Sequence, residues 1–184
     1  MFRHNLLESE RLIGNEEFMK IAFELNGKSA AAEIEPRETL AELLRARCGL
    51  TGVKISCESQ VCGSCTVLVE GLPVSACTYL AYEVRGKRVI TIEGLADAQG
   101  RLHPLQQAFI DHFAFQCGFC TPGMILAAKS LLDENAHASQ EEIIAYMSGN
   151  LCRCTGYLSI LKAIQQASAE SRGRRKTSRD GAES

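Results

Sequence analysis

Eight of the nine cysteines in this 184-residue chain fall into two groups of four, and these are the residues whose type and spacing could do chemistry. An odd total, in a chain long enough to bury a core, is more typical of metal binding or redox chemistry than of a disulfide framework. We therefore expect thiolate chemistry at two sites. The first group is Cys57, Cys62, Cys65 and Cys77, and the second is Cys117, Cys120, Cys152 and Cys154.

The first group has the spacing C-x4-C-x2-C, followed by a more distant cysteine. This is the plant-type arrangement of thiolates around a [2Fe–2S] cluster. Zinc is the competing interpretation, but zinc ligands usually come as two short pairs, and this loop does not divide in that way. Small residues between the ligands let backbone N–H groups close on the sulfurs, and they are Ser59, Gly63 and Ser64.

The second group consists of CGFC at 117–120 and CRC at 152–154. Taken alone, the C-x2-C pair fits a redox dithiol, part of a zinc site or part of a cluster site. Pro122 follows Cys120 closely, and because proline is tolerated in the first turn of a helix, a helix is predicted to begin here. The free N–H groups and the positive dipole end of a helix N-terminus stabilise thiolates and an anionic cluster.

Around the first group, the sequence predicts a small α+β unit. Residues 20–25 alternate apolar and polar side chains, and the Asn-Gly pair that follows is a strong hairpin turn, so a second strand is expected over about 30–35. Three further elements complete this half: a helix opened by a Thr39/Glu42 capping box, two short strands that turn at Gly71, and a strand over 88–92.

Beyond about residue 95, the hydrophobic period changes from that of strands to that of helices. Four short helices are predicted to pack as a bundle, over about 102–113, 121–134, 139–147 and 156–170. The domain organisation predicted for the whole chain is an N-terminal extension at 1–18, an α+β domain at 19–95, a helical domain at 96–170 and a disordered basic tail at 171–184.

Charge and composition exclude several classes of partner. The 20 Lys and Arg residues nearly balance the 22 Asp and Glu residues, and no basic face interleaved with aromatic residues appears, so nucleic acid is not expected as a partner. No apolar run approaches the ~18 residues of a membrane span, and the start of the chain lacks a signal-peptide pattern. We therefore expect a cytoplasmic protein with no membrane partner.

The remaining residues indicate an electron carrier with no catalytic residue of its own. No glycine-rich dinucleotide fingerprint, P-loop or Ser/His/Asp set is found. Cys48 belongs to neither cysteine group and is interpreted as a small buried apolar residue. The scattered histidines are interpreted as surface or packing residues, and they are His4, His103, His112 and His137.

Four motifs, in this order, resemble the small iron–sulfur subunit of the molybdenum hydroxylases, the family of xanthine dehydrogenase, aldehyde oxidase and carbon monoxide dehydrogenase. They are LTGVKISCESQVCGSCTVL, the later Cys77, FQCGFCTPGMIL and SGNLCRCTGYLSI, and the resemblance covers roughly residues 20–168. It implies a β-grasp, plant-type ferredoxin-like domain with one [2Fe–2S] cluster, then a four-helix bundle that holds a second [2Fe–2S] cluster at the ends of two helices.

The resemblance also implies a complex. Electrons would pass from a molybdopterin centre in a large subunit, through both clusters, to FAD in a medium subunit, and the assembly would be a dimer of heterotrimers. By position, Gln116 and Cys154 match residues that approach the pterin. The chain departs from the family pattern at Ser56, where glycine is common, and at Gly149, where glutamate is common.

Two alternatives belong to other classes. A free-standing ferredoxin-like carrier would shuttle between several partners, although a simple plant-type ferredoxin lacks the helical half predicted here. A zinc-stabilised interaction module would use the same cysteines structurally. Brown colour and acid-labile sulfide in the purified protein would dismiss the zinc module.

Overall fold

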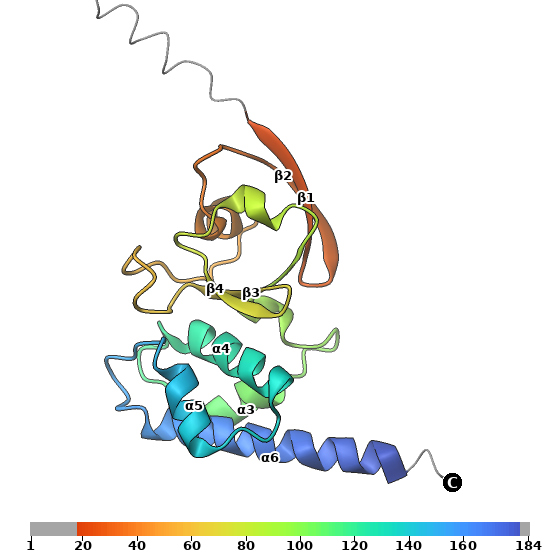
Figure 1. The fold of residues 1–184 in the computed structure, drawn as a ribbon, viewed down its shortest axis with the longest axis vertical. Coiled ribbons are helices and arrows are strands. Elements are labelled where there is room, and N and C mark those ends of the chain that lie inside the picture. The colour runs from red at the N-terminus through yellow and green to blue at the C-terminus, as the bar shows by residue number, and fades with distance from the viewer. Residues whose placement is uncertain (1–17, 181–184) are drawn as a thin grey trace, which may run out of the picture.

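The computed structural model describes the backbone of residues 18–180 and the side chains of residues 18–170 (Figure 1). A five-stranded sheet forms the first half, and helices form the second. In chain order, the elements are β1 (Met19–Leu25), β2 (Lys28–Ile34), α2 (Leu40–Glu42), the π-helical turn η1 (Leu43–Arg47), β3 (Thr66–Val69), β4 (Leu72–Ser75), the 3-10 turn η2 (Ala81–Val84), β5 (Arg88–Ile90), the 3-10 turn η3 (Ile92–Gly94), α3 (Pro104–Asp111), α4 (Thr121–Glu134), α5 (Gln140–Met147) and α6 (Leu158–Asp180).

The sheet has the strand order β2-β1-β5-β3-β4. Its outer pairs are antiparallel hairpins, and β1 runs parallel to β5 in the middle. The first hairpin turns at Asn26 and Gly27, whose φ angles of 52° and 77° are those a two-residue turn requires. The predicted hairpins are both confirmed, and the chain is α+β as expected.

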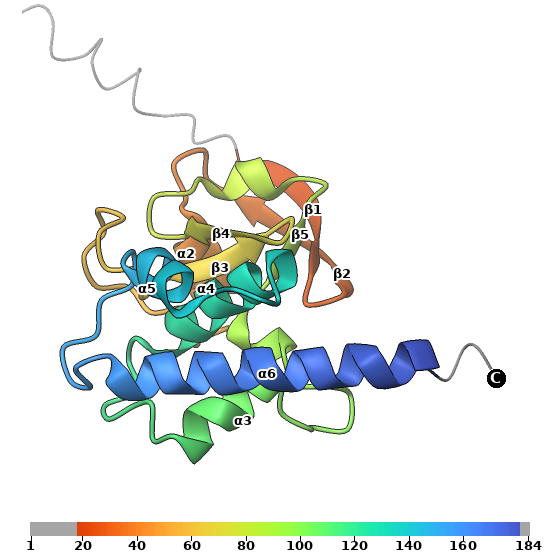
Figure 2. The same cartoon turned by 60° about the horizontal axis from the view of Figure 1, so that its bottom comes forward.

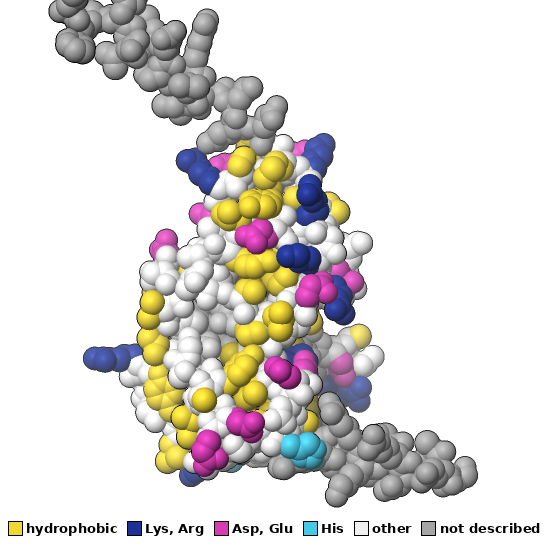
Figure 3. All heavy atoms as spheres, in the orientation of Figure 1, with side chains coloured by type: hydrophobic (Ala, Val, Ile, Leu, Met, Phe, Trp, Pro, Cys, Tyr) yellow, Lys and Arg dark blue, Asp and Glu magenta, His cyan; other side chains and the backbone are white. Residues whose placement is uncertain are grey.

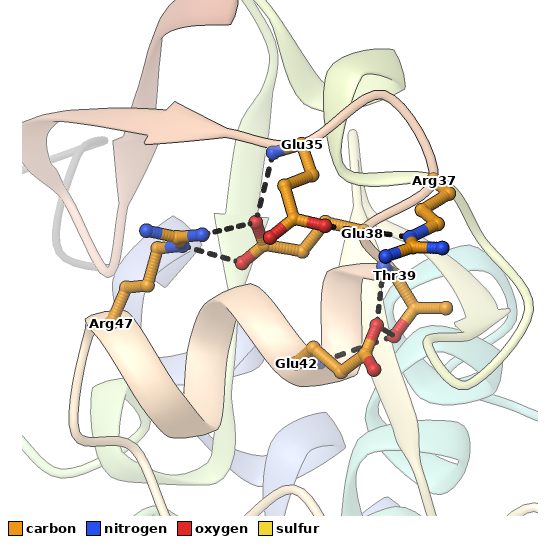
Figure 4. A network of polar contacts seen from close by, with 6 residues as sticks. All are labelled: Glu35, Arg37, Glu38, Thr39, Glu42 and Arg47. Carbon is orange, nitrogen blue, oxygen red and sulfur yellow. Dashed lines mark hydrogen bonds and ion pairs between the residues drawn. The ribbon is translucent and has the colours of Figure 1, made fainter. Parts of the chain in front are cut away.

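The helix after β2 begins at the predicted capping box. The Thr39 side chain accepts a hydrogen bond from Glu42 N, and the Glu42 carboxylate accepts one from Thr39 N. Nearby, Nε and Nη2 of Arg47 donate to the two carboxylate oxygens of Glu38 at 2.6 and 2.8 Å (Figure 4). Because Glu38 is almost buried, this bidentate pair supplies the partners that its charge needs.

The two halves meet where α4 lies across the sheet, beneath β3 and β4 (Figure 1). All four residues of β3 are buried. The helix α4 packs against this strand, and Val67 and Val69 belong to the same hydrophobic core as residues 40–44. Each half nevertheless has its own cluster of buried side chains, one drawn from residues 21–89 and the other from residues 105–167.

Four helices follow residue 104, and three of them match the predicted ranges closely. The helix α6 is longer than the predicted range of 156–170, because it continues to Asp180. Extending an existing helix adds one hydrogen bond for each residue fixed, and no proline interrupts the segment.

The strand predicted over 88–92 ends earlier, at Ile90. Thr91 N donates to the Asn26 side chain at 2.9 Å, so the chain leaves the sheet there. The N-terminal extension predicted at 1–18 lies, apart from Phe18, outside the described residues, as do residues 181–184. Within residues 18–180, no helix combines the length and the apolar character that crossing a membrane requires.

Candidate metal centres

The first cysteine loop is shaped by residues in the left-handed backbone region. Glu58, Gln60 and Gly63 have φ angles of 52°, 65° and 66°. Such angles cost energy in residues other than glycine, and they turn successive N–H groups toward one side of a loop. The Cys57 thiol accepts hydrogen bonds from the N–H groups of Ser59 and Cys62, which lower the pKa of Cys57 to about 6. The loop therefore favours a thiolate at Cys57.

Cys65 and Cys77 meet because of the β3–β4 register. Cys65 directly precedes β3, Cys77 lies two residues after β4, and Thr66 pairs with Ser75. The two side chains are 2% and 8% exposed, and their thiols contact each other. Burial, with a further contribution from the Cys77 thiol, raises the pKa of Cys65 to about 12. A positive metal centre would be needed to keep such a buried sulfur deprotonated.

The second group of cysteines comes from two loops at the ends of helices. Cys120 is the N-cap residue of α4, as predicted, and Cys117 precedes it across a turn in which Gly118 has a φ of 78°. Cys152 and Cys154 lie in the loop between α5 and α6. The sulfurs of Cys117 and Cys154 are 3.6 Å apart, and the thiols of Cys120 and Cys152 contact each other.

Two neighbours orient Cys152. Thr155 Oγ1 donates to the Cys152 sulfur at 3.1 Å, and the Cys152 N–H donates to the hydroxyl of Tyr157 at 2.9 Å. Burial acts to raise the pKa of Cys152, but the hydrogen bonds from Thr155 outweigh it together with those from Cys154 N–H and the Cys120 thiol, so the pKa is lowered. Tyr157 has a φ of 69° and precedes α6, so the helix predicted from about residue 156 begins two residues later, at Leu158.

The partner thiol has the opposite tendency. Burial, followed by the neighbouring Cys152 thiol, raises the pKa of Cys120 to about 12. Hydrogen bonding to Cys117 raises the pKa of Cys154. Contact between two sulfurs disfavours the state in which both are thiolates, because two like charges so close together repel each other.

The eight thiols therefore approach one another in twos: Cys57 with Cys62, Cys65 with Cys77, Cys117 with Cys154, and Cys120 with Cys152. Within residues 18–170, no three Cys, His, Asp or Glu side chains surround one point as the ligands of a single metal ion would. A [2Fe–2S] cluster held by four cysteines takes two thiolates on each of its two irons. The paired arrangement fits that group.

The other predicted residues are also placed. Gln116 Nε2 donates to the carbonyl of Cys154 at 3.1 Å, so the two residues assigned to the pterin do lie together. Cys48, expected to be buried, is half-buried against the first hydrophobic core, and burial raises its pKa. His103 accepts a hydrogen bond from Leu105 N and caps α3. His4 lies outside the described residues.

A contact between the two cysteine groups was not predicted. Leu151 N donates to the carbonyl of Cys62 at 2.9 Å, and Asn150 Nδ2 donates to the carbonyl of Gly63 at 2.9 Å. In both views the loop before β3 and the loop between α5 and α6 lie on the same side of the molecule (Figures 1 and 2). The only signal in the sequence was the position of Asn150 two residues before Cys152.

Two family models match the chain. One is described as a 2Fe-2S iron-sulfur cluster binding domain and matches residues 23–91, and the other is described as a [2Fe-2S] binding domain and matches residues 91–165. The two models cover the two cysteine groups separately. Two [2Fe–2S] clusters are therefore the cofactors of this chain.

Known proteins extend the match over most of the chain. The nicotine 6-hydroxylase small subunit of Paenarthrobacter nicotinovorans is 46% identical over 149 residues, which is 81% of this chain and 89% of the relative. The nicotinate dehydrogenase small FeS subunit of Eubacterium barkeri is 48% identical over 147 residues, which is 80% of this chain and 93% of the relative.

A solved structure agrees in sequence and in fold. A chain of quinoline 2-oxidoreductase from Pseudomonas putida 86 superposes with a TM-score of 0.82 at 48% identity, and the match covers 86% of this chain and 98% of that one. The paired thiols, the two matched domains and these relatives agree, and the chain belongs to the family of small iron–sulfur subunits of the molybdenum hydroxylases.

Proposed function

We propose that the two cysteine groups hold one [2Fe–2S] cluster each, with the pairs described above as the two thiolates on each iron. The observation that carries this proposal is the pairing of the sulfurs, supported by the backbone N–H groups that converge on Cys57 and by the position of Cys120 at the start of α4. When bound, such a cluster accepts and releases one electron at a time. The chain supplies the ligands, their hydrogen bonds and their shielding from water.

In this proposal, electrons enter at the second site and leave from the first. Electrons come from a molybdopterin centre in a large subunit, and FAD in a medium subunit receives them. Cys117 and Cys154 are exposed, whereas Cys65 and Cys77 are buried, so the second site is the one that opens toward a partner. The exposed Gln116, held to the Cys154 carbonyl, presents a polar group beside that opening, and we assign Gln116 and Cys154 to contact with the pterin.

The surface around the second site suits a protein partner. Phe113, Phe115 and Phe119 flank Cys117 in sequence and are 81%, 40% and 43% exposed. In Figure 3, hydrophobic side chains line the left edge of the lower half, where Figure 1 shows the loops that join the helices. Exposed aromatic residues grouped in this way are typical of a protein–protein interface. We assign this face to the large subunit.

The finer organisation is part of the same proposal. We divide the chain at residue 95 into a β-grasp ferredoxin-like domain (19–95) and a four-helix bundle (96–170), on the support of the two separate hydrophobic cores. The names of several relatives describe them as subunits of larger enzymes, and we propose a dimer of heterotrimers. A reducing compartment such as the cytoplasm would keep all nine cysteines out of disulfides.

The test is low-temperature EPR of the anaerobically purified, dithionite-reduced chain, with iron and acid-labile sulfide counted on the same sample. Two distinct reduced [2Fe–2S] signals, with iron and sulfide matching two clusters, are expected. One signal accompanied by zinc would make the second group structural and would refute the electron-transfer role. Affinity purification from the native host should then recover a molybdopterin subunit and a flavin subunit.

A further inference from the structure

The two cluster sites are joined by a short contact between two backbone segments. Residues 150 and 151 pair with residues 63 and 62: the Asn150 side chain donates to Gly63 O at 2.9 Å, and Leu151 N donates to Cys62 O at 2.9 Å. Cys62 belongs to the first site, and Leu151 is the immediate neighbour of Cys152 in the second. One hydrogen bond therefore separates the backbones that carry the two sets of ligands.

Asn150 lies at the centre of this contact. It is 6% exposed, and its Nδ2 also lies 3.4 Å from Thr66 Oγ1, which itself donates to Gly63 O at 2.7 Å. A buried amide without partners would be unfavourable, so these acceptors fix where the asparagine can sit. Because Asn150 precedes Leu151, fixing its side chain on Gly63 also places the Leu151 N–H on Cys62.

Two glycines make this approach possible and leave little freedom in it. A Cβ atom on Gly63 would lie 2.4 Å from Asn150 Nδ2, and a Cβ atom on Gly123, in the first turn of α4, would lie 2.2 Å from Gly63 O. Both distances are far below van der Waals contact. The backbone of the first loop is thus in direct contact with α4 on one side and with Asn150 on the other.

We propose, resting on the function proposed above, that Asn150 is a positioning residue that maintains the Leu151–Cys62 hydrogen bond through which the two cluster sites are connected. The connection runs from the Cys62 sulfur through the Cys62 backbone, across the Leu151 N–H···O=C hydrogen bond, and on to Cys152. An electron that crosses it leaves one cluster oxidised by one electron and the other reduced by one. No covalent bond changes, and no proton moves.

A merely structural role would be to hold the two halves of the chain together, and another residue provides a matched control for it. Ser130, on α4, is 5% exposed, and its hydroxyl donates to Gly71 O, in the β3–β4 turn, at 2.9 Å. This is also a buried bond from a side chain of the helical half to a backbone carbonyl of the sheet, but it lies away from both cysteine loops.

The experiment uses the full chain with both clusters, as wild type, Asn150→Asp, Asn150→Ala and Ser130→Ala. Iron, sulfide and the two EPR signals are measured first. The magnetic interaction between the two fully reduced clusters is then measured at low temperature, because it depends on their separation and on the bonds that join them. Hydrogen exchange at the Leu151 amide reports the connecting bond itself, and a rise on the order of tenfold is expected when that bond is lost.

We expect both Asn150 variants to keep two clusters but to lose the magnetic interaction between them and the protection of the Leu151 amide from hydrogen exchange. Ser130→Ala should keep the clusters, the magnetic interaction and the protection. An unchanged interaction in both Asn150 variants would overturn the proposal. Loss of a cluster from both would overturn it too, because Asn150 would then serve cluster retention and not connection. Absence of two [2Fe–2S] signals from the wild type would instead refute the proposed function, so the two failures are distinguishable.

Discussion

Each of the two sites has four cysteines, but the sites differ in how far the chain shields these cysteines from solvent. In the first, one pair is half-buried in a loop and the other is buried just outside the ends of β3 and β4, with Cys65 only 2% exposed. In the second, one pair is exposed, and the other is half-buried at the start of α4. The difference teaches that this chain shields the first site more fully than the second, which fits the proposal that a partner covers the second site.

Removal of a ligand should have the largest effect and should separate the two sites. We expect Cys120→Ala to abolish the second EPR signal, to halve the iron content and to stop electron flow from the molybdenum subunit, because a three-thiolate site cannot hold the cluster firmly. The first signal should persist, since its ligands come from the other half of the chain.

The control for this loss is Cys48→Ala, which removes a half-buried cysteine that belongs to neither site. It should keep both signals and all of the iron. Unchanged turnover of the Cys120→Ala complex with its natural acceptor would contradict the role in electron transfer.

The difference in exposure between the two sets of cysteines predicts that the two clusters differ in their stability in air. When the purified chain is kept in air without partners, the second signal should decay several-fold faster than the first, because oxidation of cysteine follows exposure. Parallel EPR time courses check this, and the first signal is the internal reference. Equal rates for the two signals would show that the chain protects both sites equally.

The contact between α4 and the first loop predicts a destabilised variant. Gly123→Ala would place a Cβ atom 2.2 Å from Gly63 O, so we expect a loss of about 1–3 kcal/mol in stability. The thermal midpoint of the cluster-loaded chain, measured at one scan rate, should fall. Gly149→Ala is the matched control, since a Cβ atom there meets nothing within 4 Å. Equal midpoints for the two variants would refute the close approach.

The hydrogen bond from Thr155 to Cys152 predicts that its removal changes the reduction potential of the second cluster alone. Thr155→Val removes a donor at 3.1 Å from a ligand sulfur, and loss of such a donor lowers the reduction potential of a cluster. We expect a shift of about −40 mV at the second site, the one-electron equivalent of a hydrogen bond of about 1 kcal/mol. Redox titration followed by EPR should show the first potential unchanged, and a shift of both would mean that the substitution acts on the whole chain.

The smallest expected effect concerns the Thr39/Glu42 capping box at the start of α2. Hydrogen bonds from Thr39 N–H and then from the Thr39 hydroxyl lower the pKa of Glu42 below its ordinary value of 4.5. A carboxylate with a lowered pKa stabilises the fold at pH values above its ordinary pKa, and this stabilisation is lost as the pH falls through the lowered value. We expect Glu42→Gln to cost a few tenths to about 1 kcal/mol at pH 7, and less in acid.

Thermal midpoints at pH 7 and pH 4 would measure that loss. The exposed carboxylate of Glu83 provides the control, and Glu83→Gln should leave the midpoint unchanged at both values. A Glu42→Gln midpoint that falls equally at both pH values would contradict the role of the charged capping box.

Local patterns predicted the parts of the molecule that local forces decide. The Asn26-Gly27 turn, the capping box at Thr39 and the start of α4 after Cys120 each depend on neighbours within a few residues. The spacing of the cysteines was equally informative about the kind of site, because a cluster loop needs ligands at fixed short distances along the chain.

The contact between residues 150–151 and residues 62–63 could not be predicted, because it joins residues far apart in sequence. Asn150 reaches Gly63 across 87 positions, and nothing near either residue indicates the other. The left-handed conformation of Tyr157 was also missed, since a helix was predicted from about residue 156, whereas the Tyr157 hydroxyl accepts a hydrogen bond from Cys152 N. In both cases, a bond formed in the folded chain overrides the local pattern.

The close fit of Gly63, Gly123 and Asn150 also limits how this protein can be recombined with its relatives. Two separate hydrophobic cores suggest modules that could be exchanged freely. A chimera that joins the sheet of one relative to the helices of another would nevertheless need a glycine at position 63 in the sheet half, and a glycine at 123 and an asparagine at 150 in the helical half. Residues of the two modules must therefore fit one another, so two separate hydrophobic cores do not make the halves independently exchangeable.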